Sequence, residues 1–161
     1  MSKTIFEEKQ RFNQPLVWIG LFIALSVVIY TSFFVDNERT TESQLFTLGL
    51  FLLIITLFLF IQLKTRIDDR GIHFQFFPFH FSMKTYTWDE IYSAEAIKYS
   101  PIGDYGGWGY RISFRGKGKA YSTRGDKGIK IILKDGKTRM IGTQKMEEAN
   151  SCILQYIQKK N

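Results

Sequence analysis

The sequence predicts a membrane protein with two parts, an N-terminal two-helix transmembrane hairpin and a cytoplasmic α+β domain. Two long apolar runs without charged side chains lie within the first 63 residues. From residue 64 on, apolar and polar residues alternate as they do in half-buried strands. The last residues return to a helical spacing of apolar side chains, which predicts one helix packed on a sheet. The predicted boundaries are 1–15, 16–63 and 64–161.

The apolar runs, residues 16–35 and 45–63, are each predicted to cross the bilayer as a helix. A helix of about 20 residues rises about 30 Å, which matches the thickness of the hydrocarbon core. Residues 51–61 are apolar on all sides, whereas a helix of a soluble domain keeps a polar face. A cleaved signal peptide is disfavoured, because the first run is too long and no small-residue cleavage site precedes the polar linker.

Basic residues around the two runs predict the orientation of the hairpin. The linker, residues 36–44, holds one basic residue, Arg39, whereas three basic residues lie on the far side of each run. Because cytoplasmic segments are enriched in Lys and Arg, we expect a multi-pass protein of the cytoplasmic (inner) membrane with both termini in the cytoplasm. The basic residues on the cytoplasmic side are Lys3, Lys9, Arg11, Lys64, Arg66 and Arg70.

Residues 1–15 are interpreted as an amphipathic cytoplasmic segment. Ile5, Phe6, Lys9 and Phe12 fall on one helical face. This spacing predicts a short helix lying along the membrane before Pro15 begins the first span. A cytoplasmic extension of the first span is the alternative.

Residues 64–161 are predicted to form an antiparallel sheet or barrel of seven or eight strands, capped by a C-terminal helix. Asp135-Gly136 marks a two-residue hairpin, and Thr143 is the expected N-cap of the helix. The expected strands are residues 66–70, 72–77, 79–87, 92–99, 111–114, 119–122, 128–133 and 138–141. The apolar stripe of the helix consists of Met146, Ala149, Ile153, Tyr156 and Ile157.

The domain is basic. Residues 64–161 carry eighteen basic and ten acidic side chains, a net charge of +8. Each Lys or Arg close to an anionic leaflet contributes about 1 kcal/mol of attraction, so the bilayer is the expected partner. A solvated basic surface without a specific lipid site is the alternative. Nucleic acid is not expected as a partner, because no recognition motif accompanies the charge.

Catalysis, cofactors and metals are not expected from the residue pattern. Cys152 is the one cysteine, so no intrachain disulfide forms, and a buried thiol is expected there. His73 and His80 lie in an aromatic stretch without a nearby cysteine, which is typical of strand positions. Asp68 and Asp69 are adjacent and would point to opposite faces of a strand.

A glycine-rich loop is the first candidate site. It contains Tyr105, Gly106, Gly107, Trp108 and Gly109. Glycines allow close approach of a partner, and exposed Trp and Tyr are typical of protein interfaces, so a partner-binding site is predicted. Two alternatives are a tight turn in which Trp108 plugs the barrel end, and contact of the aromatic residues with the membrane.

A Gly-Lys turn is the second candidate, for a lipid headgroup or phosphate. Its cations are Arg115, Lys117 and Lys119, and the glycine amides between them could form an anion-binding nest. A plain hairpin turn with solvated lysines is the alternative.

Several short segments resemble bacterial membrane proteins with a pleckstrin-homology (PH)-like domain, in an uncharacterised subgroup with two N-terminal transmembrane helices. They are residues 6–12, 88–91, 99–109, 116–121 and 141–144. The resemblance implies a PH-like fold and a non-enzymatic interaction module, a subunit or adaptor that contacts other membrane protein subunits or forms a homo-oligomer. A domain that binds anionic phospholipid headgroups is the alternative, because PH-like domains bind lipids, peptides or proteins.

Overall fold

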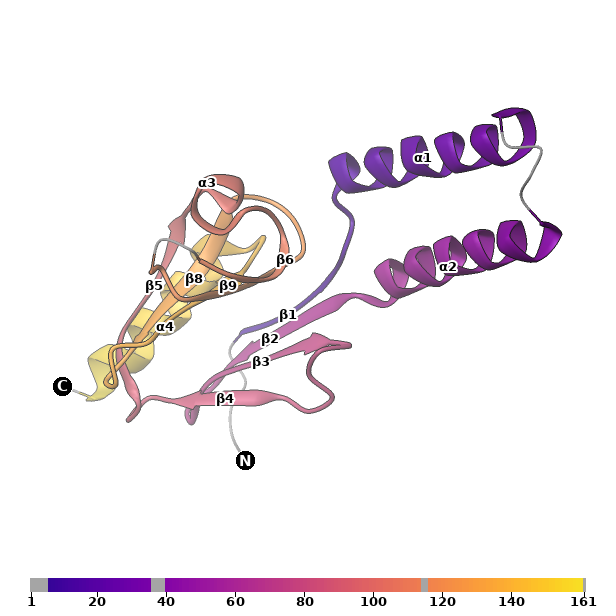
Figure 1. Ribbon diagram of the computed structural model, residues 1–161. Helices are drawn as coiled ribbons and strands as arrows, with labels where there is room; N and C mark the ends of the chain where they lie inside the picture. Colours follow the sequence, from indigo (N-terminus) through magenta and orange to yellow (C-terminus); the bar gives the residue numbers. More distant parts are fainter. Residues whose placement is uncertain (1–5, 36–39, 114–115, 161) are drawn as a thin grey trace. The chain divides into compact units, whose positions relative to one another are not determined.

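A computed structural model describes residues 6–35, 40–113 and 116–160 of the chain (Figure 1). The chain divides into two compact units. One unit consists of residues 13–60, and the other combines the residues before and after that segment. The predicted α+β architecture is confirmed in the second unit, which has two sheets and a C-terminal helix.

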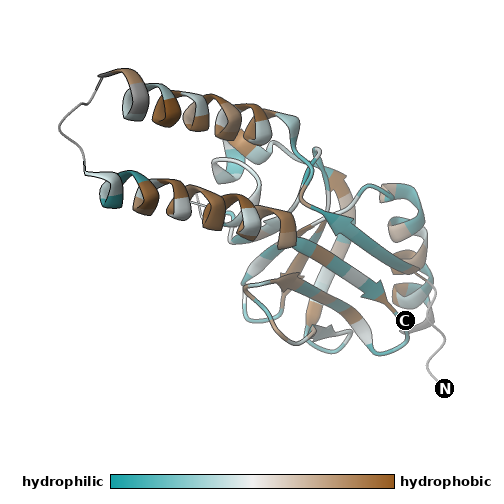
Figure 2. Cartoon of the chain, turned by 90° about the vertical axis from the view of Figure 1, so that its right-hand side faces the viewer, coloured by the Kyte–Doolittle hydropathy of each residue, from teal (hydrophilic) through white to brown (hydrophobic). Residues whose placement is uncertain are grey.

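Residues 13–60 form two apolar helices (Figure 2). Helix α1 (Pro15–Tyr30) begins with a proline, whose fixed φ suits a first helical turn. It continues as a π-helical turn, η1 (Thr31–Val35). Helix α2 covers Thr41–Phe60, and neither α1 nor α2 contains a buried residue.

By length and composition, α2 is the one helix of the described chain that could cross a membrane. Helix α1 is a shorter apolar helix, so the two-helix hairpin stays a prediction. The second helix begins at Thr41 and ends at Phe60, instead of covering residues 45–63. The predicted span also includes residues 61–63, but Gln62 and Leu63 belong to β2 and Ile61 directly precedes that strand.

The first sheet is antiparallel and has the order β1-β2-β3-β4. Its strands β1 and β2 are neighbours, although the whole helical segment lies between them in the sequence. Beyond their last pair, the Phe12 amide donates to the Ile61 carbonyl over 3.0 Å. The strands are β1 (Phe6–Arg11), β2 (Gln62–Ile67), β3 (Gly71–Phe77) and β4 (Lys84–Thr87).

Strand β1 corrects the prediction of an amphipathic helix within residues 1–15. Phe6, Glu8 and Gln10 point inward, and the residues between them are exposed. Two of the three inward positions are polar, which hid the two-residue period of a strand. The folded domain therefore does not begin at residue 64 but also includes β1 and the start of β2.

The second sheet has the order β5-β8-β9-β7-β6. All its pairs are antiparallel except β7 with β9, which is parallel. The described residues thus form nine strands in two sheets, rather than one antiparallel sheet of seven or eight. The strands are β5 (Ile91–Lys98), β6 (Gly109–Ile112), β7 (Lys119–Ser122), β8 (Lys127–Leu133) and β9 (Thr138–Gly142).

Helix α4 (Met146–Lys160) confirms the predicted C-terminal helix, and it packs on β5 and β8. Ala149 and Ile153 of the predicted stripe are fully buried, and Cys152 is buried as expected. Thr143 lies before the first turn, where its hydroxyl accepts from the Lys145 amide over 3.1 Å. The largest fully buried side chains around this core are Leu63, Ile67, Ile72, Phe74, Phe76, Ile129, Ile131, Ile141 and Ile153.

Buried polar side chains join β1 to the segments around β9. Gln10 Nε2 donates to the Gly142 carbonyl over 2.8 Å, and its Oε1 accepts from the Thr123 hydroxyl over 2.9 Å. Glu8 accepts from the Thr143 hydroxyl over 2.5 Å and from the Gln144 amide over 2.9 Å. These bonds make β1 an integral part of the domain.

Candidate functional site

The predicted partner-binding loop follows a short helix, α3 (Pro101–Tyr105), which the sequence did not predict. Gly106 ends this helix in the left-handed conformation, with φ +73°, and Gly107 and Gly109 also have positive φ. The glycines are therefore needed for the path of the backbone itself.

The two aromatic side chains of this loop are held by hydrogen bonds within the domain. Tyr105 is buried, and its hydroxyl donates to the Lys117 carbonyl over 2.9 Å. Burial raises the pKa of Tyr105 to about 12. Trp108 is half-buried, and its indole N–H donates to the Gly125 carbonyl over 2.8 Å. The loop thus has the geometry of the alternative in which Trp108 folds back onto the domain.

The predicted phosphate-binding cations have different neighbours. Lys117 Nζ lies 2.6 Å from the Asp104 carboxylate. Lys119 Nζ lies 5.7 Å from the ring centre of Tyr110, within range of a cation–π contact. Arg115 lies outside the described residues. Of the two described lysines, Lys119 is therefore the one without an acidic neighbour among the ion pairs of the described chain.

Lys119 lies beside an aromatic cluster that connects the two sheets. Tyr110 and Tyr121 stack with ring centres 5.1 Å apart and an interplanar angle of 5°. His80 lies 5.3 Å from Tyr121, and Phe79 lies 5.8 Å from Tyr110. The cluster joins β6 and β7 to the segment between β3 and β4.

That segment, residues 78–83, is called the aromatic loop below. It follows Phe77, the last residue of β3, which pairs with Gln62, the first residue of β2. Three of its large apolar side chains are exposed: Phe79 by 57%, Phe81 by 83% and Met83 by 42%. The sequence predicts a separate strand over residues 79–87, because apolar and polar residues alternate after Pro78, but only Lys84–Thr87 form a strand.

Cations flank the aromatic loop. Burial lowers the pKa of the His80 imidazole, and the charges of Lys84 and Lys119 lower it further. His80 Nδ1 is buried and has no hydrogen-bond partner among the described residues. The loop therefore combines exposed apolar side chains with a neutral imidazole and two nearby positive charges.

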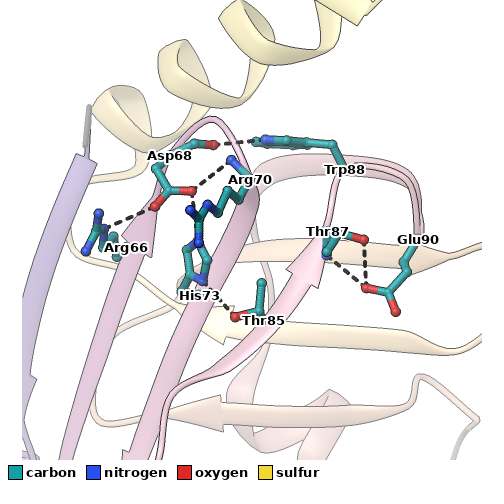
Figure 3. Close-up of polar contacts among 8 residues, drawn as sticks. All are labelled: Arg66, Asp68, Arg70, His73, Thr85, Thr87, Trp88 and Glu90. Atoms are coloured by element: carbon teal, nitrogen blue, oxygen red, sulfur yellow. Dashed lines mark hydrogen bonds and ion pairs between the residues drawn. The ribbon is translucent and has the colours of Figure 1, made fainter. Parts of the chain in front are cut away.

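A second polar cluster closes the turn between β2 and β3 (Figure 3). Asp68 is 2% exposed, and its carboxylate accepts from the Arg70 amide over 2.9 Å. It also lies 3.2 Å from Arg66 Nε and 2.8 Å from His73 Nε2. The other ring nitrogen of His73 lies 2.8 Å from the Thr85 hydroxyl.

The electrostatics of this cluster favour the ionised carboxylate. Burial alone would raise the pKa of Asp68, but hydrogen bonds from His73 and Arg70 and the charge of Arg66 lower it overall. Thr85, His73 and Asp68 connect a hydroxyl, an imidazole and a carboxylate in series, an order that also occurs in hydrolase triads. Here the carboxylate is ion-paired and bonded to its own turn, which suits a structural role for the cluster.

A cleft of about 530 Å³ lies beside β4 and the β8–β9 hairpin. Its charges are mixed, and several are paired internally. Lys137 Nζ lies 2.7 Å from Asp135, and Arg139 Nε donates to the Tyr86 hydroxyl over 3.1 Å. The cleft therefore does not present a field of one sign to a ligand.

Comparisons with known proteins identified no relative of this chain. No protein-family model matches the sequence. No curated protein and no solved structure matches it either. The function must therefore be inferred from the fold and its exposed groups.

Proposed function

We propose that the protein is a two-pass membrane protein whose α+β domain is a non-enzymatic interaction module at the cytoplasmic face of the membrane. The proposal rests on one observation, the insertion of residues 13–60 between the hydrogen-bonded neighbours β1 and β2. The two sheets and the C-terminal helix support a PH-like character of the domain.

The insertion bears on the number of membrane crossings. Strands β1 and β2 lie about 4.8 Å apart, so the chain leaves and rejoins the sheet at nearly the same place. A segment that begins and ends on one side of a membrane crosses it an even number of times. If α2 crosses, the segment before it must therefore cross as well.

The segment before α2 is long enough for this crossing. Helix α1 and η1 run without interruption from Pro15 to Val35 and contain no charged residue. At about 1.5 Å per residue they reach about 30 Å, which is the thickness of the hydrocarbon core. Lys9, Arg11 and Lys64 lie next to the two junctions, as the positive-inside rule requires of a cytoplasmic domain.

The apolar helices favour partners within the membrane. Since neither helix has a fully buried residue, much of their surface is available to lipid, to a second copy or to other membrane subunits. A role as subunit or adaptor in a membrane protein assembly is consistent with this surface and with the mixed charges of the cleft beside β4.

A second candidate function is binding of anionic phospholipid headgroups. Lys84 and Lys119 favour it, because both lie near His80 beside the exposed aromatic loop. The domain would then respond to lipid composition.

Cysteine accessibility in the membrane tests the two-pass topology. In a Cys152→Ala background, single cysteines replace Asn37 in the linker and the exposed Asp69 in the β2–β3 turn. An impermeant maleimide should label position 37 only from outside and position 69 only from the cytoplasmic side. Labelling of both positions from the same side would overturn the proposal.

Co-purification tests the role in an assembly. The full chain is extracted in mild detergent, cross-linked and analysed by mass spectrometry. A recurrent subunit, or a second copy of the chain, is expected. A monomer without a recurrent partner would contradict the interaction role while leaving the topology intact.

A further inference from the structure

We infer that the aromatic loop, residues 78–83, is a third membrane contact, which inserts Phe79, Phe81 and Met83 into the boundary between headgroups and acyl chains. The inference rests on the proposed two-pass topology. It adds a lipid-binding surface within the folded domain itself.

The position of the loop follows from strand register. Helix α2 ends at Phe60, and Gln62 begins β2 two residues later. Gln62 pairs with Phe77, the residue immediately before the aromatic loop. Neighbouring strands lie about 4.8 Å apart, so the loop leaves the sheet next to the residues that emerge from the membrane. At this end of the sheet, β1 also leads to α1 (Figure 1).

The chemistry of the loop suits the interface. Its exposed apolar side chains are two phenylalanines and a methionine within five residues. Other exposed large apolar side chains of the domain, such as Tyr92 and Ile102, occur singly. The sequence from Phe77 to Thr87 contains no acidic residue. Apolar groups combined with positive charge are the features of segments that lie in an anionic membrane surface.

The loop is held in this exposed arrangement before any lipid binds. Phe79 stacks on Phe76 with ring centres 5.7 Å apart, and Phe81 meets Phe77 edge-on at 6.0 Å. The Gln75 side chain donates to the Phe81 carbonyl over 2.7 Å. Insertion therefore needs little ordering of the backbone, which favours binding.

The flanking cations place the loop on an anionic leaflet. Lys84 begins β4 directly after the loop, and Lys119 lies beside the ring of Tyr110, which contacts Phe79. Their charges would lie at headgroup depth while the phenyl rings reach below them. Lipid, rather than a protein groove, is the favoured occupant because Gln62, which pairs with the residue before the loop, follows the end of α2 by two residues.

The test uses the full chain as the sole membrane protein in nanodiscs of phosphatidylcholine and phosphatidylglycerol in equal amounts. In the Cys152→Ala background, Phe81→Cys carries a polarity-sensitive fluorophore. Asp69→Cys is the matched control, because it lies in the turn at the opposite end of β2 and β3. Lipids with a nitroxide near the headgroup should quench the probe at position 81 several-fold more than the probe at position 69. Aqueous iodide should show the reverse order.

A label-free measurement guards against disturbance by the fluorophore. Hydroxyl-radical footprinting would compare the unsubstituted chain in the same nanodiscs and in small detergent micelles. Phe81 and Met83 should be oxidised less in the nanodiscs than in the micelles. Tyr92, which is 77% exposed on β5, should be oxidised equally in both.

The outcomes separate the inference from the proposed function. Equal quenching at positions 81 and 69, with position 37 on the opposite side of the membrane, would overturn the membrane-contact inference alone. Positions 37 and 69 on the same side would overturn the two-pass topology. Protection of Phe81 in native membranes, but not in nanodiscs that contain this chain alone, would assign the loop to a protein partner and overturn lipid as its occupant.

Discussion

At the scale of single residues, Asp68 is the buried charge with the most numerous partners in the β2–β3 turn. Asp68→Asn keeps the size of the side chain but removes the charge that faces Arg66 and His73. We expect a loss of about 1–3 kcal/mol in the free energy of unfolding, because asparagine keeps only one acceptor oxygen for the donors of Arg66, Arg70 and His73. Denaturant titration followed by tryptophan fluorescence would measure it. Asp69→Asn, in the same turn but exposed, should change the stability little.

The same carboxylate predicts an acid dependence of stability. The pKa of Asp68 is lowered in the folded chain, so its contribution is present above the unfolded pKa of about 3.9 and is lost as the pH falls through the folded value. The parent chain should therefore lose more stability than Asp68→Asn between about pH 5 and pH 2. Parallel acid slopes for the two chains would show that Asp68 is not the titrating group.

Gly118 shows where a glycine is required by packing. Its φ is +80°, and a Cβ atom there would lie 2.1 Å from the Thr138 carbonyl oxygen of β9. Gly136 also has φ +80°, but a Cβ atom there would have open space. Both changes to alanine strain the backbone by about 1 kcal/mol. Thermal unfolding should show Gly118→Ala to be clearly less stable than Gly136→Ala, whereas equal losses would mean that β7 and β9 shift apart freely.

At the scale of secondary-structure elements, β1 is held by its buried polar side chains. Gln10→Leu removes the bonds to the Gly142 carbonyl and the Thr123 hydroxyl. We expect faster amide hydrogen exchange in residues 7–11, measured by mass spectrometry, because two buried polar groups lose their partner. Lys9→Gln, on the exposed face of the same strand, is the control. Unchanged exchange in Gln10→Leu would show that β1 is held by its pairing with β2 alone.

The elements that the sequence predicted well are those with regular local signals. Strands β3, β8 and β9 alternate apolar residues or flank the Asp135-Gly136 turn, and α4 carries an apolar stripe, so their prediction needed no tertiary information. The helix predicted within residues 1–15 was wrong. The inward residues of β1, Glu8 and Gln10, form hydrogen bonds with residues more than a hundred positions away. Long-range polar partners leave no periodic signal in the sequence.

For the candidate sites too, local backbone features were predicted from the sequence, whereas contacts between distant residues were not. Glycines at positions 106, 107 and 109 predicted an unusual backbone, and their positive φ values confirm it. The burial of Tyr105 could not be read from spacing, since its hydroxyl donates to the Lys117 carbonyl, twelve residues later in the β6–β7 connection. The aromatic loop was not predicted, because the apolar residues after Pro78 resemble a strand. Its position near Gln62 follows from the pairing of β2 with β3, which the sequence does not reveal.

At the scale of the whole molecule, the chain is a folded domain interrupted by an apolar insertion. Residues 13–60 lie between two strands that pair with each other, and Phe12 is hydrogen-bonded to Ile61. An antiparallel pair of this kind can be joined by a two-residue Asn-Gly turn. The domain therefore contains everything needed for its own sheets once the insertion is replaced, provided that β1 is kept.

Replacing residues 13–60 by Asn-Gly should thus give a soluble, folded α+β domain. A chain of residues 61–161 is the matched comparison, because it retains every other strand but lacks β1 and the buried bonds of Glu8 and Gln10. It should be less stable by several kcal/mol, since each orphaned buried group costs about 1–3 kcal/mol. Size-exclusion chromatography, circular dichroism and denaturant titration would compare the two chains. Equal stability would mean that β1 is dispensable, and an aggregated Asn-Gly chain would mean that the domain needs its membrane segment to fold.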